Sequence, residues 1–175
     1  MDITIAQISL SETYPTHRAV LYPDGPEHRI HIPNDDQGVH FGALRRPAAG
    51  SGLEVAKLSG EIISVISLFR EPLPAHLAES LYPGENLLHV DDLARTLRFR
   101  NFACLKAYQG LGIGTNMLQH VITIAKNDSN LGPGSVIWCD ARRSTEGWYL
   151  KRGMKVLGNP FLKGDIEYIV MAIIV

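Results

Sequence analysis

Residues 108–115 read Tyr-Gln-Gly-Leu-Gly-Ile-Gly-Thr, and this stretch decides the fold. Its three glycines alternate with apolar residues, between a β-like run at residues 96–105 and a helix-like run that begins at Ile113. Glycine lets a backbone turn tightly and approach another molecule closely, because it has no Cβ. The amides at the start of the following helix have no intrahelical acceptor and lie at the positive end of the helix dipole. The stretch therefore predicts a loop that binds phosphate or pyrophosphate.

Three glycine-rich motifs compete for this stretch. A dinucleotide fingerprint needs Gly-x-Gly-x-x-Gly, but a pattern that starts at Gly110 has Thr115 in its third glycine position. A pattern that starts at Gly112 also fails, because Met117 is in its third glycine position. A Walker P-loop ends in Gly-Lys-Ser or Gly-Lys-Thr, and neither tripeptide occurs in the chain. The pattern Gln/Arg-x-x-Gly-x-Gly/Ala is matched in full by Gln109, Gly112 and Gly114.

The matched pattern resembles the acyl-CoA-binding motif of the GNAT acyltransferase superfamily. Its surroundings are similar too, because a predicted strand precedes it and a long predicted helix follows it. A second segment resembles the family's Tyr-x-x-x-Gly-Phe motif, with Tyr149 and Gly153 in register and Met154 in place of the phenylalanine. The chain departs from the family at Lys106, where a proline is usual, and at residues 140–142, where the Asn-x-x-Ala pattern is poorly kept.

The resemblance covers residues 96–157 and implies an α/β class with a mixed α+β sheet, in the GNAT-like acyl-CoA acyltransferase fold. Such a fold has a central, mostly antiparallel sheet that contains a parallel, splayed pair of strands and is flanked by helices. We expect a single domain over residues 1–175. Strands are predicted at residues 3–9, 39–44, 61–69, 96–105, 136–139, 154–157 and 166–175. Helices are predicted at residues 11–21, 113–128 and 144–152, and Pro15 is expected to limit where the first one begins.

Three regions are rich in Pro, Gly, Asp or His and have no clear periodicity. Residues 22–36 are predicted to form an irregular loop, and residues 48–52 a turn. Residues 71–95 are predicted to hold short helical pieces near 75–81 and 91–94, and to form a lid or a substrate-facing insertion.

Composition narrows the classes of partner. The chain has 17 basic and 18 acidic residues, so its balance of charge gives no reason to expect nucleic-acid binding.

Cys104 and Cys139 are the only cysteines, and we expect both to be small buried hydrophobes rather than a disulfide or a nucleophile. The pair His28 and His31 has no further ligands nearby, so no metal is predicted. The N-terminus lacks a signal peptide and no apolar run reaches about 20 residues, so we expect a cytoplasmic protein without a membrane partner.

The resemblance implies acetyl-CoA as the acyl-donor substrate. Its pyrophosphate would lie on the amides of the glycine loop, and its pantetheine arm would pair like an added strand with the end of the preceding strand. The residues predicted to bind the donor are Phe102, Ala103, Cys104, Gln109, Gly110, Leu111, Gly112, Ile113, Gly114 and Thr115.

The resemblance also implies a catalytic residue. Tyr149 would stand beside the thioester sulfur and protonate the departing CoA thiolate. No general base is assigned, because the family often has a glutamate on its fourth strand and residues 96–105 contain no acid. Arg98 and Arg100 alternate there instead, which fits either an acidic acceptor or a solvated face. An ordered-water relay is one alternative, and the side-chain candidates are Glu61, His40, His89, Asp91 and Asp92.

Two functions remain open at this point. The first is an acyl-CoA-dependent N-acyltransferase that moves acetyl from acetyl-CoA to a primary amine of a small molecule or peptide, directly in a ternary complex. The second is a non-catalytic acyl-CoA-binding regulatory module of the same fold. The acceptor is not identified, since residues 11–36 and 71–95 would shape its site. Proteins of this family are often homodimers, so the resemblance adds a homodimer as one expected assembly.

Overall fold

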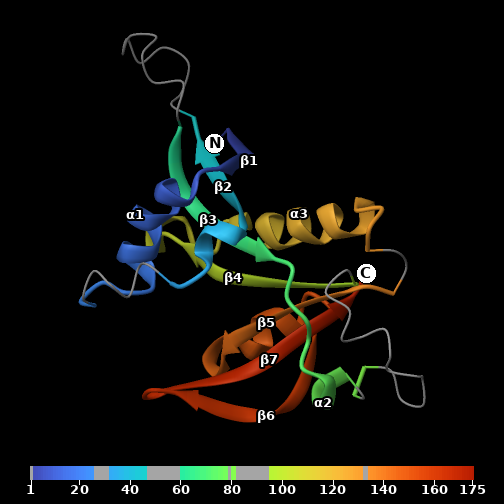
Figure 1. Cartoon of the computed structure of the whole chain (residues 1–175). Helices are drawn as coiled ribbons and strands as arrows, with labels where there is room; N and C mark the ends of the chain where they lie inside the picture. The colour runs from blue at the N-terminus through green and yellow to red at the C-terminus, as the bar shows by residue number, and fades with distance from the viewer. Residues whose placement is uncertain (1, 26–31, 47–59, 79, 82–94, 132–133) are drawn as a thin grey trace, which may run out of the picture. The chain divides into compact units, whose positions relative to one another are not determined.

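The structure is a computed structural model, and it describes residues 2–25, 32–46, 60–78, 80–81, 95–131 and 134–175. Its strands form a seven-stranded sheet in the order β1-β2-β3-β4-β5-β7-β6 (Figure 1). The strands are β1 (Ile3–Ile8), β2 (Val39–Arg45), β3 (Glu61–Phe69), β4 (Thr96–Cys104), β5 (Val136–Arg142), β6 (Lys155–Lys163) and β7 (Ile166–Ile174). The helices are α1 (Leu10–Val20), α2 (Ala75–Ala78), α3 (Ile113–Asn127) and α4 (Glu146–Leu150).

The sheet is mixed. β1 pairs antiparallel with β2, and β7 pairs antiparallel with both β5 and β6. β4 and β5 are parallel, and their register covers Thr96–Arg98 against Val136–Trp138, although both strands continue beyond it. The predicted α/β class, with a mostly antiparallel sheet and one parallel pair, is therefore confirmed.

The chain divides into two compact units. The first consists of Met1–Ser67 and Asn101–His120, and the second of Leu68–Arg100 and Val121–Val175. β3, β4 and α3 each contribute residues to both units. The prediction of a single domain stays a prediction.

In the first unit, α1 spans Leu10–Val20, against the predicted 11–21, and contains Pro15. Ser9 is the N-cap, and its backbone amide donates to the Glu12 carboxylate at 2.7 Å, as in a capping box. The helix therefore starts at this cap. Pro15 lies inside the helix, and because proline has no backbone N–H, one hydrogen bond of the helix is not made. The predicted helix is confirmed to within one residue at each end, and the cap at Ser9 rather than Pro15 fixes where it begins.

In the second unit, one face of the sheet packs on α2 and the residues beside it. This core consists of Leu73, Leu77, Ala78, Leu81, Val136, Trp138, Leu157, Val170 and Ala172. Alternation along β5 sends Val136 and Trp138 to this face and Ile137 and Cys139 to the opposite one. The short helix predicted near residues 75–81 is confirmed as α2.

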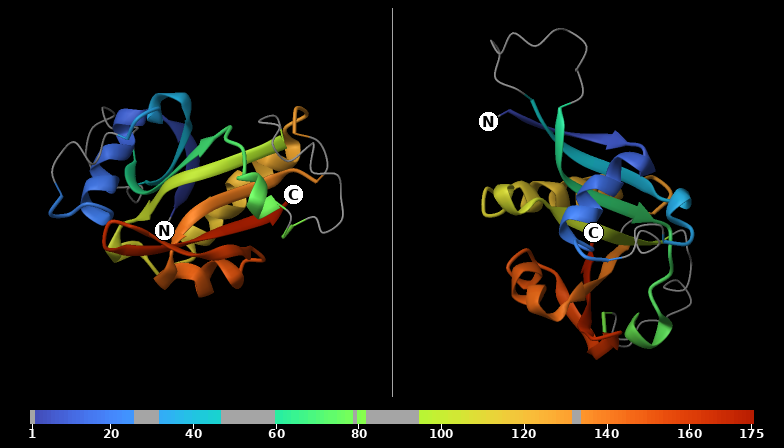
Figure 2. Two further views of the ribbon diagram at one scale, coloured as in Figure 1. Left: turned by 60° about the horizontal axis from the view of Figure 1, so that its bottom comes forward. Right: turned by 90° about the vertical axis from the view of Figure 1, so that its left-hand side faces the viewer.

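β6 is longer than the sequence indicated. The predicted strand covered residues 154–157, but β6 continues through Gly158, Asn159 and Pro160 to Lys163 and lies beside β7 (Figure 2). Pairing with β7 sustains it, and the register shifts between Leu157 and Phe161. β6 ends the strand order of the sheet, where a proline removes no ladder hydrogen bond on its outer side.

Some predictions fall on residues outside the described ranges. They are the turn at 48–52, the helical piece at 91–94, most of the predicted lid, and the side chains of His28, His31, His89, Asp91 and Asp92. Within the described ranges, the helices are too short or too polar to cross a membrane.

Candidate active site

The glycine loop has the geometry that its sequence predicts. β4 ends at Cys104, a short turn follows at Lys106–Tyr108, and α3 starts at Ile113. Gly110 and Gly112 have φ of 78° and 82°, in the left-handed region that favours glycine. Asn116 donates its amide to the carbonyl of Gly112 at 3.0 Å, which fixes the first turn of the helix. The first amides of α3 therefore emerge directly from the loop.

The space in front of the loop is open within the first unit. A Cβ added to Gly110 or to Gly112 would meet no atom of the described residues within 4 Å. These glycines are therefore required by backbone conformation and not by crowding. Among the described residues, no neighbouring side chain fills the space beside these two glycines.

The Gln109 side chain has a structural role in this loop. Its Nε2 donates to the carbonyl of Cys104 at 2.9 Å and so ties the loop to the end of β4. Next to it, the Tyr108 hydroxyl donates to the Glu61 carboxylate at 2.8 Å. The motif glutamine thus explains how the loop keeps its shape, which the sequence alone did not indicate.

The end of β4 is bent by Asn101, which has a φ of 53°. Few non-glycine residues adopt this conformation, and asparagine is among those that do. The side chains of His17 and Asp35 hold the bend. The backbone carbonyl of Asn101 is hydrogen-bonded to His17 Nε2 at 3.2 Å, and the side-chain Nδ2 of Asn101 donates to Asp35 Oδ2 at 3.2 Å. The sequence analysis missed this bend, and asparagine within a strand was the available signal.

The carbonyls along the predicted pantetheine segment already accept hydrogen bonds. Ser64 Oγ donates to the carbonyl of Ala103 at 2.8 Å, and Gln109 donates to that of Cys104. A carbonyl has a second lone pair, so both groups can still accept from a ligand. These contacts fix the direction of the segment before any ligand arrives.

Tyr149 lies in the second unit, on α4. Its side chain is 8% exposed, and its hydroxyl is hydrogen-bonded to Cys139. Its ring contacts those of Trp148 and Phe99, with centroids at 4.9 and 6.0 Å. Burial raises the pKa of Tyr149 well above its ordinary value, so the hydroxyl keeps its proton at neutral pH.

The loop and the helices that flank the sheet agree with a comparison to known families. The model of the Acetyltransferase (GNAT) family matches residues 10–154. The chain belongs to this family. Its members are acetyltransferases, which places the protein in that class of enzymes.

Individual relatives agree with the family assignment. The chain is 24% identical over 174 residues to the uncharacterised N-acetyltransferase YitI of Bacillus subtilis (strain 168), covering 97% of this chain and 94% of that protein. The fold is similar to the IAA acetyltransferase from Bacillus cereus ATCC 14579, with a TM-score of 0.63, 17% identity, and coverage of 99% and 100% of the two chains. It is also similar to a GNAT family acetyltransferase from Elizabethkingia anophelis with acetyl-CoA bound, with a TM-score of 0.60, 17% identity, and coverage of 99% and 98%.

In this GNAT protein, neither cysteine is suited to act as a nucleophile. Burial raises the pKa of Cys104 and that of Cys139, so both thiols stay protonated at neutral pH. Among the described residues, no group of three His, Cys, Asp or Glu side chains could hold a metal ion.

Two of the general-base candidates lie in described parts of the chain, and both are engaged. Glu61 accepts from Tyr108 and pairs with Arg45 at 3.1 Å. His40 is buried, its Nδ1 is hydrogen-bonded to Ser67 Oγ at 2.8 Å, and burial lowers its pKa. Both side chains therefore have structural partners in the first unit.

The buried His17 predicts a pH-dependent stability. Burial lowers its pKa to about 4, whereas an exposed histidine titrates near 6.5. The folded state thus binds fewer protons than the unfolded state between these values. Stability is complete above pH 6.5 and falls as the pH drops from 6.5 towards 4. We expect His17 to cost about 2 kcal/mol of unfolding free energy between pH 7 and pH 5.

Urea denaturation at pH 7, 6 and 5 measures this loss. His17→Gln should flatten the pH dependence, because glutamine does not titrate and its amide can still donate to the Asn101 carbonyl. His76→Gln, at an exposed position on α2, is the matched control and should keep the wild-type slope. Equal slopes for wild type and His17→Gln would contradict the assignment.

Proposed function

We propose that the protein transfers the acetyl group of acetyl-CoA to a primary amine of a small molecule or peptide. One observation carries the proposal: the glycine loop, in which Gly110 and Gly112 have positive φ, leads into the amides of α3 in a chain of the GNAT family. The Elizabethkingia anophelis protein, which has the same fold, carries acetyl-CoA. A pyrophosphate on the loop amides of residues 110–115 would accept hydrogen bonds and lie at the positive end of the helix dipole.

The donor would extend from this loop along β4. Its pantetheine amides would pair with the backbone of residues 102–104, which the contacts of Ser64 and Gln109 hold in place. The bend at Asn101 lies immediately before this segment. A backbone N–H at this strand end would donate to the oxyanion that forms on the thioester carbon.

The acetyl group would pass directly from acetyl-CoA to the amine in a ternary complex. A free amine attacks the thioester carbon, the C–N bond forms, and collapse of the tetrahedral intermediate breaks the C–S bond. The acceptor must first lose a proton, since an alkylammonium has a pKa near 10.4 and no free lone pair. Tyr149 would give its proton to the CoA thiolate, and an ordered-water relay would carry the proton of the amine away.

The alternative is a regulatory module that binds acyl-CoA without catalysis. One observation favours it: β4 carries no acid, and both described candidates for a base are engaged in structural contacts. The two functions share the donor site and differ in whether free CoA is produced.

Release of CoA thiol from acetyl-CoA across a panel of primary amines tests the proposal, with acetyl-CoA affinity measured separately by calorimetry. Amine-dependent release is expected, and each product should carry one acetyl group by mass spectrometry. Tight acetyl-CoA binding without release on any amine would support the regulatory module instead. The homodimer and the cytoplasmic location stay predictions.

A further inference from the structure

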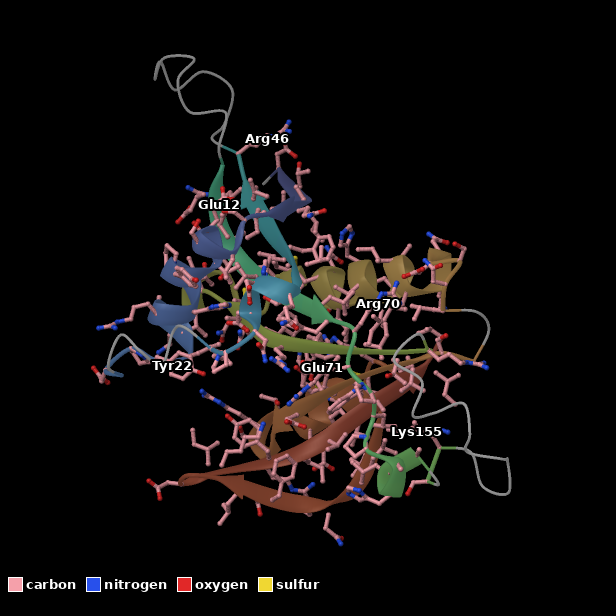
Figure 3. All side chains as sticks on the ribbon, viewed as in Figure 1. Glu12, Tyr22, Arg46, Arg70, Glu71 and Lys155 are labelled. Carbon is pink, nitrogen blue, oxygen red and sulfur yellow. The ribbon has the colours of Figure 1, made fainter. Side chains whose placement is uncertain are left out.

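Two buried side chains from outside β4 hold the bend of this strand at Asn101. His17 is 1% exposed and lies near the end of α1, the helix on which Figure 3 labels Glu12. Asp35 is 3% exposed and begins the single turn of 3₁₀ helix at Asp35–Gln37. We call His17 and Asp35 the β4 clamp. The clamp, Asn101 and the glycine loop all belong to the first unit.

The β4 clamp holds Asn101 by its backbone and by its side chain. A carbonyl oxygen only accepts, so the proton of the 3.2 Å hydrogen bond to the Asn101 carbonyl is on His17 Nε2. Burial lowers the pKa of His17 to about 4, so the ring is neutral at neutral pH and brings no charge to this bond. The second bond, from Asn101 Nδ2 to Asp35 Oδ2, fixes the side chain of the same residue.

The clamp is anchored to the rest of the first unit. Thr16, which precedes His17, donates its hydroxyl to the carbonyl of Ile62 on β3 at 3.4 Å. The turn that carries Asp35 is closed by the amide of Gly38, which donates to the Asp35 carbonyl at 3.2 Å. A non-glycine residue with positive φ costs free energy and persists only where its surroundings hold it. Such residues are concentrated at functional sites, so the bend calls for a functional explanation.

The bend sets the direction of the amides that follow it. A peptide unit is planar and trans, so the hydrogen bond that fixes the Asn101 carbonyl also fixes the direction of the Phe102 N–H. A residue of positive φ within a strand acts like a bulge and redirects the groups beyond it. At the other end of the segment, the Leu105 amide donates to the Ile63 carbonyl at 2.9 Å. Residues 102–104 therefore lie between two fixed points.

We infer that His17 and Asp35 are positioning residues for the acyl donor, because they hold Asn101 in the bend that aims the amides of residues 102–104 at the pantetheine arm. This inference rests on the proposed function and adds two residues outside the glycine loop to the donor site. The clamp acts on the arm, whereas the loop acts on the pyrophosphate. The two parts of the donor are thus bound by contacts that can be measured separately.

Two substitutions of Asn101 test the role of the bend. Asn101→Val and Asn101→Gly both lose the bond to Asp35, but positive φ is an outlier for a β-branched residue and costs glycine nothing. Calorimetry measures the affinities for acetyl-CoA and for ADP, which has a pyrophosphate and no pantetheine arm. We expect Asn101→Val to bind acetyl-CoA about 10-fold more weakly than Asn101→Gly, with equal affinities for ADP. Equal acetyl-CoA affinities in the two variants would overturn the inference.

Substitutions of Asp35 test the clamp itself. Asp35→Ala removes the acceptor of the Asn101 side chain, whereas Asp35→Asn keeps an oxygen in its place. We expect Asp35→Ala to weaken acetyl-CoA binding at least about 5-fold without changing ADP binding, and Asp35→Asn to restore it to within about 2-fold of wild type.

Thr13→Val is the matched control for the loss of a buried polar group in this unit. The Thr13 side chain is fully buried on α1, and its hydroxyl donates to the Leu10 carbonyl at 2.6 Å without contacting Asn101. It should keep both affinities. Parallel losses for acetyl-CoA and ADP in Asp35→Ala would overturn the positioning role. The Asn101 pair leaves the clamp unchanged, so it decides the inference if Asp35→Ala does not fold.

Turnover separates this inference from the proposed function. Weaker acetyl-CoA binding in Asn101→Val than in Asn101→Gly, together with no release of CoA on any amine by the wild type, would reject catalysis and keep the clamp. Amine-dependent release by the wild type with equal affinities in the two variants would keep catalysis and reject the clamp. If the wild type bound acetyl-CoA no more tightly than ADP, the arm would have no site on β4, and the inference would be overturned whatever the turnover.

Discussion

Replacing Gly112 by tryptophan should weaken acetyl-CoA binding by on the order of 1000-fold. Gly112 has a φ of 82°, and in the part of the chain that the structure describes a Cβ placed on it would meet no atom within 4 Å. The new side chain would therefore enter the open space in front of the loop, where we place the pyrophosphate. Hydrogen bonds to a charged group contribute about 1.5–3 kcal/mol each, so the loss of two of them accounts for the expected effect.

Calorimetric titration with acetyl-CoA measures this change, and circular dichroism checks the fold. Gly164→Trp is the matched control, because Gly164 also has a positive φ, of 59°, and an added Cβ there meets no atom within 4 Å. It lies in the turn between β6 and β7, so it should keep the affinity for acetyl-CoA while bearing similar backbone strain. If Gly112→Trp kept its affinity as well, the proposed pyrophosphate site would be wrong.

Tyr149→Phe should lower kcat by on the order of 100-fold and leave the affinity for acetyl-CoA nearly unchanged. The substitution removes the hydroxyl that we propose as the acid and keeps the ring that packs on Trp148 and Phe99. Its structural cost is the hydrogen bond with Cys139, whose weakly polar thiol tolerates that loss. A lower kcat at constant donor affinity would identify a group that acts on the chemical step.

The pH profile gives a second test of the same residue. Because the pKa of Tyr149 is raised well above its ordinary value of about 10, the acid should stay protonated as the pH rises. The rate of the wild type should therefore increase as the amine loses its proton and should show no descending limb below about pH 10. Tyr168→Phe, at a half-buried tyrosine of β7, should behave like wild type. Unchanged turnover in Tyr149→Phe would remove Tyr149 from the mechanism.

Much of the fold could be predicted because its signals are local. The loop at residues 108–115 predicted the helix that follows it, and α3 runs from Ile113 to Asn127 as the apolar spacing indicated. β3 matches its predicted bounds, because a run of β-branched residues specifies a strand without reference to neighbours.

The extents of two other strands depended on the strand with which they pair. β5 was predicted to end at residue 139 and continues to Arg142, where it pairs with Tyr168 of β7. β6 passes through a Gly-Asn-Pro segment that is typical of a turn. In both cases the hydrogen bonds of a neighbouring strand outweigh a weak or contrary local preference, and such bonds join residues far apart in the sequence.

The features of the candidate site likewise fall into those that local sequence predicts and those that depend on distant partners. The sequence by itself determined the glycine loop, the family and the class of donor, because these rest on backbone conformation within eight consecutive residues. Only the tertiary structure showed that Asn101 bends β4 against His17 and that Arg98 and Arg100 belong to a network with Glu71, Asp140 and Lys163. Burial and charge pairing are set by which distant side chains fold onto one another. The glycine loop could therefore be predicted from one segment, whereas the partners of Asn101 and of the arginines of β4 became visible only after several strands had been brought together.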